Sequence, residues 1–405
     1  MHILVLSDFF PPQFNAGAEN IAFEISKGYI AKGNRVSVIT TNKSLQKGEL
    51  FVDKKKSLTC YQIGYNYNEK LSAYVGIYNQ VVLKVINKII LENDFEVAHI
   101  HNIHTYISYS VISLLNKHSI PAILTVHDAM SVDYGKYDQE VNNGDISLNA
   151  RLSSKASQFK IWRKNWKRYN PLRNFIIKHQ FKGLRKIVCV SRELEEFLNA
   201  NGIINTQVIH NGLSEVDRPS SGDIENFKNK MNIGLNDKVI LFTGRISLAK
   251  GFEQVQSLLR RLIVKEKNIR LLVVGKKLKF DSEIEENVIN TGWLSKKEMN
   301  LAYNASNVTL VPSIYLDPFP TVVLESMCLG TPVIASVYSG AKEAVIDGVT
   351  GYHVNPFDID DFSEKTLNIL HNLDLSHSMS NKSKQEFSRR FTLEKCVKQY
   401  LELLF

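Results

Sequence analysis

Residues 311–335, VPSIYLDPFPTVVLESMCLGTPVIA, combine a strand end, a proline-rich loop, a short helix and a second strand. Thr321–Leu329 is predicted to be the helix, with Pro320 just before it and Gly330 as its C-terminal stop. Short apolar strands that alternate with helices in this way are typical of an α/β fold with a parallel sheet.

This helix brings polar chemistry to the loop before it. A helix that begins at Thr321 aims free N–H groups and a partial positive charge at that loop, which suits an anion such as a diphosphate. Asp317 lies in the loop, and Glu325, one turn into the helix, can accept two hydrogen bonds from a diol. The simpler alternative is a capped helix with Glu325 on a solvated face, because acidic residues are common in first turns.

The length of 405 residues predicts two domains, with a boundary in the polar stretch 214–237. The four cysteines are scattered, which indicates a reducing compartment and disfavours zinc. The first apolar run is too short for a signal peptide, and no run is long enough for a transmembrane helix. We therefore expect a cytoplasmic protein that can still touch a membrane surface. The net charge of +9 is concentrated locally.

Polar residues follow several predicted strands of the N-terminal half, where parallel sheets bind ligands. His101 and His104 come after one strand, and His127 ends another beside Asp128. No cysteine or paired carboxylate joins these histidines, so a metal site is not expected. Asp128 can orient His127 for catalysis, or it can hydrogen-bond a purely structural histidine. The predicted strands are 3–7, 35–41, 58–63, 96–100, 120–126, 186–190 and 207–209, and one long helix is expected over 71–91.

Gly17 lies at the turn from the first strand to the first helix. It either lets the backbone approach a ligand or only permits a tight turn. The pattern resumes in the second half with a strand over 238–243 and the loop 244–251, which holds two glycines and the cations Arg245 and Lys250. The loop is not a Walker A motif, but it can cradle a phosphate. Further strands are predicted over 269–274, 288–291, 308–311 and 332–335.

Residues 146–192 contain no Asp or Glu and many Lys and Arg. Aromatic side chains fall at helical spacing on one face, and basic side chains occupy the others. This pattern favours contact with an anionic membrane surface. The alternatives are an aromatic stripe packed on the domain core and, without a supporting motif, nucleic-acid binding. The aromatics are Phe159, Trp162, Trp166 and Tyr169, and the bases are Lys160, Arg163, Lys164, Lys167 and Arg168.

Seven motifs follow one another in a fixed order along the chain. They are AGAE at 16–19, TVHD at 125–128, CVSREL at 189–194, HNG at 210–212, GRISLAKG at 244–251, VVG at 273–275 and DPFPTVVLESMCLGTPVIA at 317–335. With them the chain resembles the retaining glycosyltransferases of family 4. The resemblance implies the GT-B fold, with two Rossmann-like parallel-sheet domains that face each other across a cleft. It places an N-terminal acceptor domain at 1–215, a donor domain at 216–389, and a last helix, about 390–405, back on the N-terminal domain.

The resemblance also implies a nucleotide-diphosphate-sugar donor and no metal or other cofactor. Arg245 and Lys250 would hold the diphosphate, Glu325 the ribose and Asp317 the donor sugar, with His127 near that sugar. The catalytic group would thus be His127, Arg245, Lys250 and Asp317. The donor-binding set would be Gly17, Gly244, Arg245, Lys250, Gly275, Lys276, Trp293, Asp317, Phe319, Pro320, Thr321, Val322, Val323 and Glu325.

The expected acceptor is a lipid-linked glycan of cell-surface polysaccharide synthesis, met at the inner face of the cell membrane. The other interpretations are a non-catalytic nucleotide-sugar-binding subunit and a different GT-B enzyme, such as an epimerase or a phosphorylase. The chain departs from the family pattern at Asp317, usually glutamate, at Pro320, often glycine, and at Ala16, usually glycine. Residues expected to contact the acceptor or the membrane are His101, His104, Trp162, Arg163, Lys164, Trp166, Lys167 and Arg168.

Overall fold

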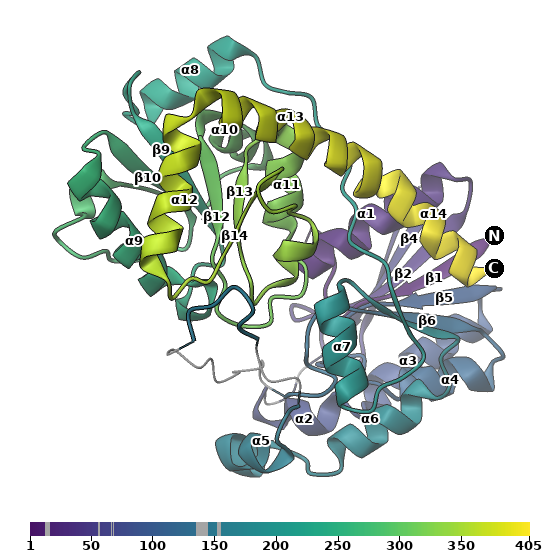
Figure 1. The fold of residues 1–405 in the computed structure, drawn as a ribbon. Helices are drawn as coiled ribbons and strands as arrows, with labels where there is room; N and C mark the ends of the chain where they lie inside the picture. Colours follow the sequence, from purple (N-terminus) through teal and green to yellow (C-terminus); the bar gives the residue numbers. More distant parts are fainter. Residues whose placement is uncertain (13–16, 56, 66, 68, 135–144, 152–154) are drawn as a thin grey trace. The chain divides into compact units, whose positions relative to one another are not determined.

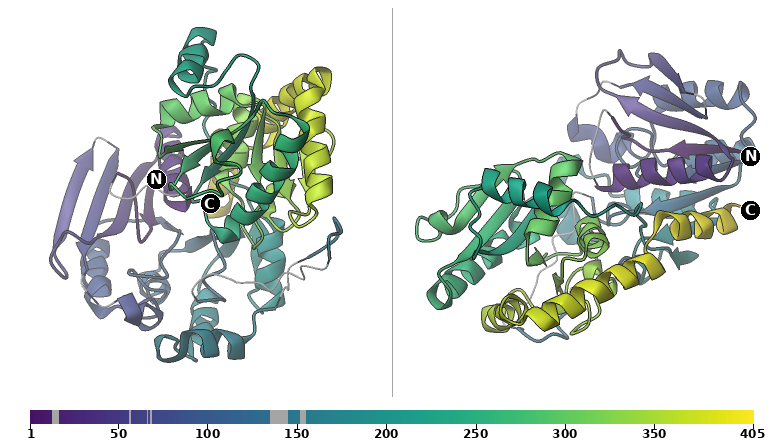
Figure 2. Two further views of the ribbon diagram at one scale, coloured as in Figure 1. Left: turned by 90° about the vertical axis from the view of Figure 1, so that its left-hand side faces the viewer. Right: turned by 90° about the horizontal axis from the view of Figure 1, so that it is seen from above.

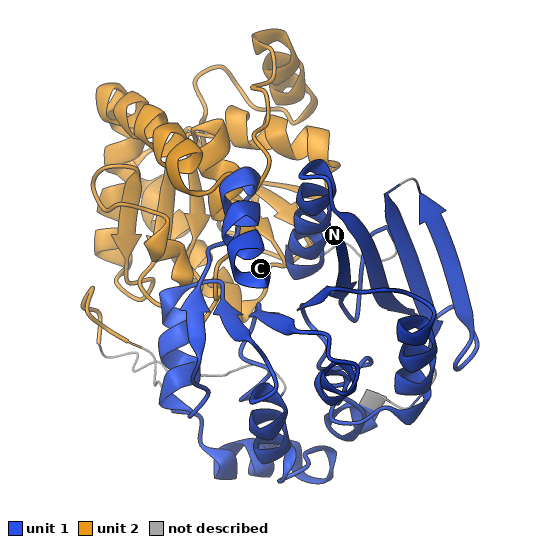
Figure 3. Ribbon diagram, turned by 90° about the vertical axis from the view of Figure 1, so that its right-hand side faces the viewer, with its two compact units in different colours: residues 1–137, 154–212, 393–405 blue, residues 138–153, 213–392 orange. Residues whose placement is uncertain are grey.

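The computed structural model describes residues 1–12, 17–55, 57–65, 67, 69–134, 145–151 and 155–405. Their contacts divide the chain into two compact units (Figure 3). Unit 1 comprises residues 1–137, 154–212 and 393–405, and unit 2 comprises 138–153 and 213–392. The predicted α/β class is confirmed, because each unit is built on its own sheet of mainly parallel strands.

Unit 1 contains eight strands in the order β3-β4-β2-β1-β5-β6-β7-β8. All neighbours are parallel except β3, which pairs antiparallel with β4 at one edge (Figure 2). This edge strand was not predicted from the sequence, because its side chains are mostly exposed and lack a buried apolar run. The strands are β1 (His2–Leu6), β2 (Arg35–Asn42), β3 (Leu50–Lys55), β4 (Leu58–Gly64), β5 (Val97–Ile100), β6 (Ala122–Val126), β7 (Lys186–Cys189) and β8 (Thr206–Val208).

The helices of unit 1 include one correction. The long helix expected over 71–91 is wrong: α2 stops before Gly76, and α3 starts after Asn79, whose side chain accepts a hydrogen bond from the Val82 N–H. A Cβ on Gly76 would lie 2.0 Å from the His104 carbonyl oxygen, so the chain turns where another backbone segment passes. The helices are α1 (Gly17–Ala31), α2 (Ser72–Val75), α3 (Gln80–Leu91), α4 (Val111–Lys117), α5 (Gln158–Asn165), α6 (Arg173–Phe181), α7 (Arg192–Ala200) and α14 (Leu393–Leu404).

The last helix, α14, belongs to unit 1 although the chain reaches it from unit 2. It packs against α1 and against strands β5 and β6. Tyr400 and Cys396 are buried in this packing, and Arg185 binds the carbonyl oxygen of Leu404 at 2.8 Å. Burial of the apolar face of α14 therefore fixes the end of the chain on the first sheet.

Unit 2 has six parallel strands in the order β11-β10-β9-β12-β13-β14. Helices α9 and α12 pack on one face of the sheet, and α8 and α10 pack on the other (Figure 1). The strands are β9 (Lys238–Gly244), β10 (Ile269–Gly275), β11 (Val288–Gly292), β12 (Val308–Val311), β13 (Val333–Ser336) and β14 (Gly351–Val354). The helices are α8 (Ser221–Lys230), α9 (Phe252–Lys265), α10 (Lys296–Ala305), α11 (Thr321–Leu329), α12 (Ile359–His371) and α13 (Leu373–Arg390).

A segment far away in the sequence joins unit 2. The side-chain amide of Asn355 donates to the carbonyl oxygens of Asp145 at 2.9 Å and Ser147 at 3.1 Å. Ala150 packs on Val337 and Tyr338. The described residues 145–151 thus belong by contact to the second sheet, although they come before two strands of the first.

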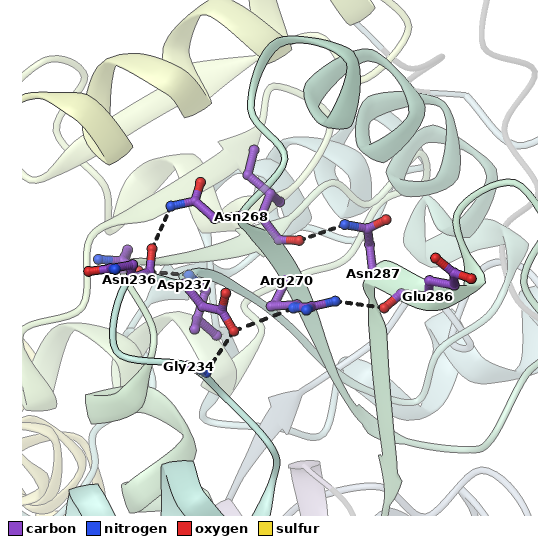
Figure 4. Close-up of polar contacts among 10 residues, drawn as sticks. Gly234, Asn236, Asp237, Asn268, Arg270, Glu286 and Asn287 are labelled. Carbon is purple, nitrogen blue, oxygen red and sulfur yellow. Dashed lines mark hydrogen bonds and ion pairs between the residues drawn. The ribbon is translucent and has the colours of Figure 1, made fainter.

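The amino edge of the second sheet is held by a polar network (Figure 4). Arg270, near the start of β10, donates to the Asp237 carboxylate at 3.4 Å and to the Glu286 carbonyl oxygen at 2.7 Å. The same Asp237 oxygen accepts from the Gly234 N–H at 2.7 Å. The side chain of Asn287 donates to the Ile269 carbonyl oxygen at 2.9 Å. These bonds tie the loops before β9, β10 and β11 together.

Candidate active site

The carboxyl edge of the second sheet gathers the loops after β9, β10 and β12. Strands β10, β9 and β12 are neighbours, so residues that follow them meet at one place. The loop 244–251 leaves β9, and α11 follows the proline-rich loop after β12. The predicted bounds of α11, Thr321–Leu329, are those observed, and Gly330 ends it with φ +80°.

Glycines allow these loops to touch through their backbones. Gly275 has φ +143°, and a Cβ there would lie 2.1 Å from the carbonyl oxygen of Gly244. Gly251 has φ +81°, and its Cβ would lie 2.2 Å from the Pro312 carbonyl oxygen. No side chain fits at either position, so the three loops form one close-packed rim. Gly244 also has positive φ, at +112°.

Lys250 is held beside the predicted sugar-side acid. Its ammonium group forms a short ion pair with Asp317 and lies 5.4 Å from the centre of the Tyr315 ring. The Ser313 hydroxyl donates to the same Asp317 oxygen at 2.9 Å. Burial alone would lower the pKa of Lys250, but Asp317 and Tyr315 outweigh it and raise that pKa above its ordinary value. Lys250 is therefore a fixed positive charge at neutral pH.

Arg245, five residues earlier in the same loop, differs from Lys250. Its side chain is exposed, and it makes no ion pair with any residue that the structure describes. A guanidinium group without a carboxylate partner at a helix-facing, glycine-lined rim suits an oxyanion such as a phosphate.

The start of α11 adds backbone donors to this rim. Pro320 is its N-cap residue, and no side chain caps the helix. The loop before it is fixed through the Asp317 carbonyl oxygen, which accepts from the Gly340 N–H at 2.9 Å and the Ser339 hydroxyl at 3.2 Å. The partial positive charge of the helix start thus lies on a rigid loop, as expected for an anion site.

Glu325 is oriented by a residue that the sequence analysis missed. The Tyr303 hydroxyl, from α10, donates to Glu325 Oε2 at 2.8 Å. Burial raises the pKa of Glu325 above its ordinary value, although Tyr303, Thr321 and Lys296 act in the opposite direction. The solvated alternative for Glu325 is wrong, because its carboxylate is partly buried and held. Tyr303 lies in a different helix, so no local sequence signal links it to Glu325.

Other predicted donor-binding residues differ in what their side chains can reach. Phe319 and Val323 are buried, and Phe319 packs on Phe391 with ring centres 5.8 Å apart, so only their backbone atoms can face a ligand. Lys276 and Trp293 are exposed, directly after β10 and β11. Pro320, Thr321 and Val322 are half-buried at the start of α11. Gly17 begins α1 in unit 1, and a Cβ built on it would meet no described atom within 4 Å; Ala16 lies outside the described residues.

The histidines of unit 1 form a cluster at the ends of β5 and β6. His101 Nδ1 lies 2.9 Å from His127 Nε2, with the two rings stacked at 5.2 Å. His127 therefore bonds to a second histidine, and the predicted orienting bond from Asp128 is not formed. Asp128 instead accepts from the Met130 N–H at 2.9 Å and lies 3.9 Å from His104 Nε2. Burial lowers the pKa of His127 to about 4, although Asp128 acts to raise it.

Asp8, two residues after β1, holds the loop after β5 that carries His101 and His104. Its carboxylate accepts from the N–H groups of Thr105 at 2.7 Å, Tyr106 at 3.0 Å and Ile107 at 2.7 Å. Burial raises the pKa of Asp8, while the charge of His104 and these three bonds act to lower it. An acid directly after a short buried strand was the only sequence sign of this role.

The basic aromatic segment is exposed at three of its four aromatic residues. Phe159, Trp162 and Trp166 are 66%, 38% and 56% exposed. Tyr169 is buried instead and donates to Gln158 at 2.7 Å. The aromatic residues do not form one continuous stripe, because α5 ends at Asn165 and Trp166 adopts φ +46°. The core-packing alternative is therefore wrong for the first three aromatics. Arg163, Lys164, Lys167 and Arg168 are exposed beside them.

Two features are absent from the described residues. These residues contain no group of three or more His, Cys, Asp or Glu side chains placed to hold a metal ion. They also contain no helix with the length and hydropathy needed to cross a membrane.

Two family profiles match the chain. Residues 15–215 match Glycosyltransferase Family 4, and residues 223–386 match Glycosyl transferases group 1. The lipopolysaccharide 1,2-N-acetylglucosaminetransferase of Salmonella typhimurium is 28% identical over 194 residues, 44% of this chain and 51% of that protein. An uncharacterised glycosyltransferase of Methanocaldococcus jannaschii is 26% identical over 230 residues, 53% of this chain and 58% of that protein. The chain thus spans 51–58% of the length of these two curated relatives.

Solved structures resemble the whole chain. Sucrose-phosphate synthase of Thermosynechococcus elongatus gives a TM-score of 0.75 at 19% identity and covers 99% of this chain and 98% of its own. HepE of Anabaena, in complex with UDP and glucose, gives 0.69 at 18% identity and covers 100% of this chain and 99% of its own. At these identities the likeness establishes the fold.

Proposed function

The chain belongs to glycosyltransferase family 4 and has the GT-B fold, and from this premise we propose that it is a retaining, metal-independent hexosyltransferase. Its donor is a nucleotide-diphosphate-sugar, bound by unit 2. HepE, which shares the fold, was solved with UDP-glucose and with UDP and glucose, which supports a donor of this class.

One observation supports the proposal most directly. The glycine-lined rim presents a fixed ammonium at Lys250, an exposed guanidinium at Arg245 with no ion pair to the described residues, and a helix start at Thr321 whose N-cap side chain makes no hydrogen bond. Together they supply positive charge that would offset the negative charge developing on a departing diphosphate, a task that a divalent metal performs in other enzymes. Glu325, one helical turn further and oriented by Tyr303, is placed to accept the two hydroxyls of a ribose.

We propose roles for the remaining catalytic residues from the family resemblance. Asp317, which now accepts bonds from Lys250 and Ser313, would hydrogen-bond hydroxyls of the donor sugar. His127 would contact a sugar hydroxyl from unit 1. Retention without a positioned nucleophile is consistent with departure and attack on the same face of the sugar, with the leaving phosphate accepting the acceptor's proton.

Calorimetry tests the donor class. We expect uridine or guanosine diphosphate and the matching sugar nucleotides to bind the wild type. Glu325→Gln should weaken the binding of nucleotides that carry a ribose diol. A 2′,3′-dideoxynucleotide is the matched ligand control, because it should bind both proteins alike. Failure of every nucleoside diphosphate to bind would rule out the proposal.

Product analysis separates a transferase from the two other interpretations. A non-catalytic subunit would bind the donor and release no free nucleoside diphosphate, even with acceptor extracts. An epimerase would change the sugar of the donor without an acceptor, and a phosphorylase would need pyridoxal phosphate, which is visible by absorbance. A transferred sugar whose anomeric configuration matches the donor by NMR would establish retention.

The acceptor proposal rests on a separate observation, the exposed aromatics and bases of α5 and of the turn that follows it, Trp166–Arg168. Trp162 and Trp166 lie 5.0 Å apart between ring centres and border the exposed Arg163, Lys167 and Arg168. Tryptophan with basic neighbours is typical of a surface that enters the headgroup region of an anionic membrane. We therefore propose a lipid-linked glycan acceptor, met at the inner face of the cell membrane.

Vesicle binding tests this surface. Replacing Trp162, Arg163, Lys164 and Trp166 together should abolish sedimentation with phosphatidylglycerol vesicles, because each base contributes about 1 kcal/mol near such a surface. The matched control replaces Leu235 and Val264, which are 92% and 85% exposed in unit 2, with serine. Equal binding of all three proteins would contradict the membrane proposal and leave the donor proposal standing.

A further inference from the structure

Three histidines of unit 1 form one connected polar chain. His99 lies in β5, and its ring centre is 4.1 Å from that of His101, which in turn stacks on His127. His99 and His101 are buried, and burial lowers the pKa of both below the ordinary histidine value. Each ring is therefore neutral near pH 7 and carries one proton on one of its two nitrogens.

The proton on His99 is fixed by its two neighbours. The Thr125 hydroxyl donates to the Tyr400 hydroxyl at 3.1 Å, so its oxygen must accept from His99 Nε2, 2.7 Å away. His99 Nδ1 is then free of a proton and accepts from the Tyr29 hydroxyl at 2.8 Å. Both nitrogens of His99 are satisfied, and the ring has a single tautomer.

His101 and His127 share one contact and therefore have linked tautomers. Only one proton can lie between His101 Nδ1 and His127 Nε2, which are 2.9 Å apart. If His127 donates, its Nδ1 is bare and His101 carries its proton on Nε2. If His101 donates, its Nε2 is bare and His127 carries its proton on Nδ1. The two rings cannot be assigned independently.

The first arrangement is favoured by the intrinsic preference of the two rings. It places both protons on Nε2, the more stable site of a free neutral histidine side chain. His101 Nε2 is buried with no hydrogen-bond partner among the residues that the structure describes, so no contact with those residues decides between the two arrangements at that nitrogen. His101 lines a small recess, partly open to solvent, whose lining also includes Ser131. The Ser131 hydroxyl is another buried group of this recess without a partner among those residues.

We infer that His101 is a positioning residue that holds His127 with its proton on Nε2 and its Nδ1 bare, so that Nδ1 accepts a hydrogen bond from a sugar hydroxyl. The inference rests on the proposed function only for the last clause, the sugar. Orientation of a catalytic imidazole usually comes from a carboxylate or carbonyl partner. Here a second neutral imidazole supplies it, and Asp128, the adjacent acid, bonds elsewhere.

The tautomer of wild-type His127 can be measured without any substrate. Two-bond ¹H–¹⁵N NMR of protein labelled in histidine, near pH 7, distinguishes a protonated from a bare ring nitrogen. Loss of signals in His127→Gln assigns that ring. We expect a protonated Nε2 and a bare Nδ1. A protonated Nδ1 on His127 would overturn the inference, whatever the protein transfers.

Variants test the link between the two rings. His101→Phe keeps the ring size and removes the acceptor, so the His127 signals should shift toward a mixture of tautomers and kcat should fall ~10- to 100-fold, the usual cost of losing an orienting partner. The donor KM should stay unchanged, because unit 2 binds the diphosphate. His101→Asn retains an acceptor oxygen near the Nδ1 position and should restore most of the rate.

Ser131→Ala is the matched control, since it removes the other unpartnered group of the recess and leaves the His127 contact intact. Its His127 tautomer and kcat should equal those of the wild type. If His101→Phe leaves both the His127 signals and kcat unchanged, His101 does not position His127. If His101→Phe does not fold, the wild-type spectrum and the His101→Asn variant still decide whether His101 positions His127. If no protein transfers sugar, the proposed function fails while the tautomer assignment stands on the spectra.

Discussion

The two edges of the second sheet each carry an arginine, and the two side chains have opposite surroundings. At the amino edge, Arg270 is bonded to the Asp237 carboxylate and the Glu286 carbonyl oxygen. At the carboxyl edge, Arg245 follows β9 directly and has no ion-pair partner among the described residues. The first arginine joins loops of the fold, and the second is held out toward solvent by the glycine-lined rim.

The difference shows how to separate a structural charge from a functional one. A charge whose hydrogen-bond capacity is used within the chain stabilises the fold and has little left for a ligand. A charge that the fold leaves unpaired, beside glycines that admit no side chain, is available to a ligand of opposite charge. Lys250 lies between these cases, because Asp317 holds it in place until a stronger anion competes.

The largest expected effect is on catalysis by Arg245. Arg245→Ala should lower kcat for sugar transfer about 10²–10³-fold, because it removes a preorganised charge from the departing diphosphate. Its melting temperature should match that of the wild type, since no described ion pair is lost. Steady-state kinetics and thermal unfolding check both parts. A variant with full activity would remove Arg245 from the functional edge.

A smaller effect is expected on the rim itself. Gly275→Ala places a Cβ 2.1 Å from the Gly244 carbonyl oxygen at φ +143°, and should lower the free energy of unfolding by about 1–3 kcal/mol. Gly222→Ala in α8 is the matched control, because nothing lies within 4 Å of its Cβ and its φ is not positive. Chemical denaturation measures both. Equal stabilities would mean that the rim is not close-packed.

At the amino edge, we expect the opposite of the Arg245→Ala result, a loss of stability without a loss of activity. Arg270→Ala should lower the free energy of unfolding by about 1 kcal/mol, since it removes a partly exposed ion pair and one hydrogen bond to a carbonyl. Its kcat and donor KM should not change. If Arg270→Ala loses activity to the same degree as Arg245→Ala, the two edges do not differ in the way described.

The smallest effect is expected from metal removal. If Arg245 and Lys250 supply the charge for the leaving diphosphate, EDTA should leave the transfer rate unchanged. The measurement is the initial rate of wild type with EDTA, with EDTA and excess Mg²⁺, and with neither. A rate that EDTA abolishes and Mg²⁺ restores would place a metal ion at the carboxyl edge.

Local signals predicted much of the fold and part of the site. Helix α11 and its Gly330 stop follow from residues next to one another in sequence. Contacts between elements were not predictable. Tyr303 reaches Glu325 from another helix, and His101 meets His127 across neighbouring strands. No periodicity within one element encodes such pairs.

The basic aromatic segment is a second place where the local sequence did not predict the structure. Helical spacing predicted one continuous stripe, but the backbone turns at Trp166 and sends Tyr169 into the core. Residues at helical spacing share a face only where the helix continues, and tertiary contacts decide where it stops.

The buried setting of Glu325 makes ligand affinity a function of proton concentration. Its pKa is raised in the folded chain, so the protonated form is favoured and the fold loses some stability as pH rises through that value. On the proposed function, a ribose diol would donate to the ionised form and pull the pKa back down, so nucleotide binding below the raised pKa would expel a proton into the buffer. Affinity for a ribose nucleotide should therefore weaken as the solution becomes acidic, and the heat of binding should vary with the ionisation enthalpy of the buffer.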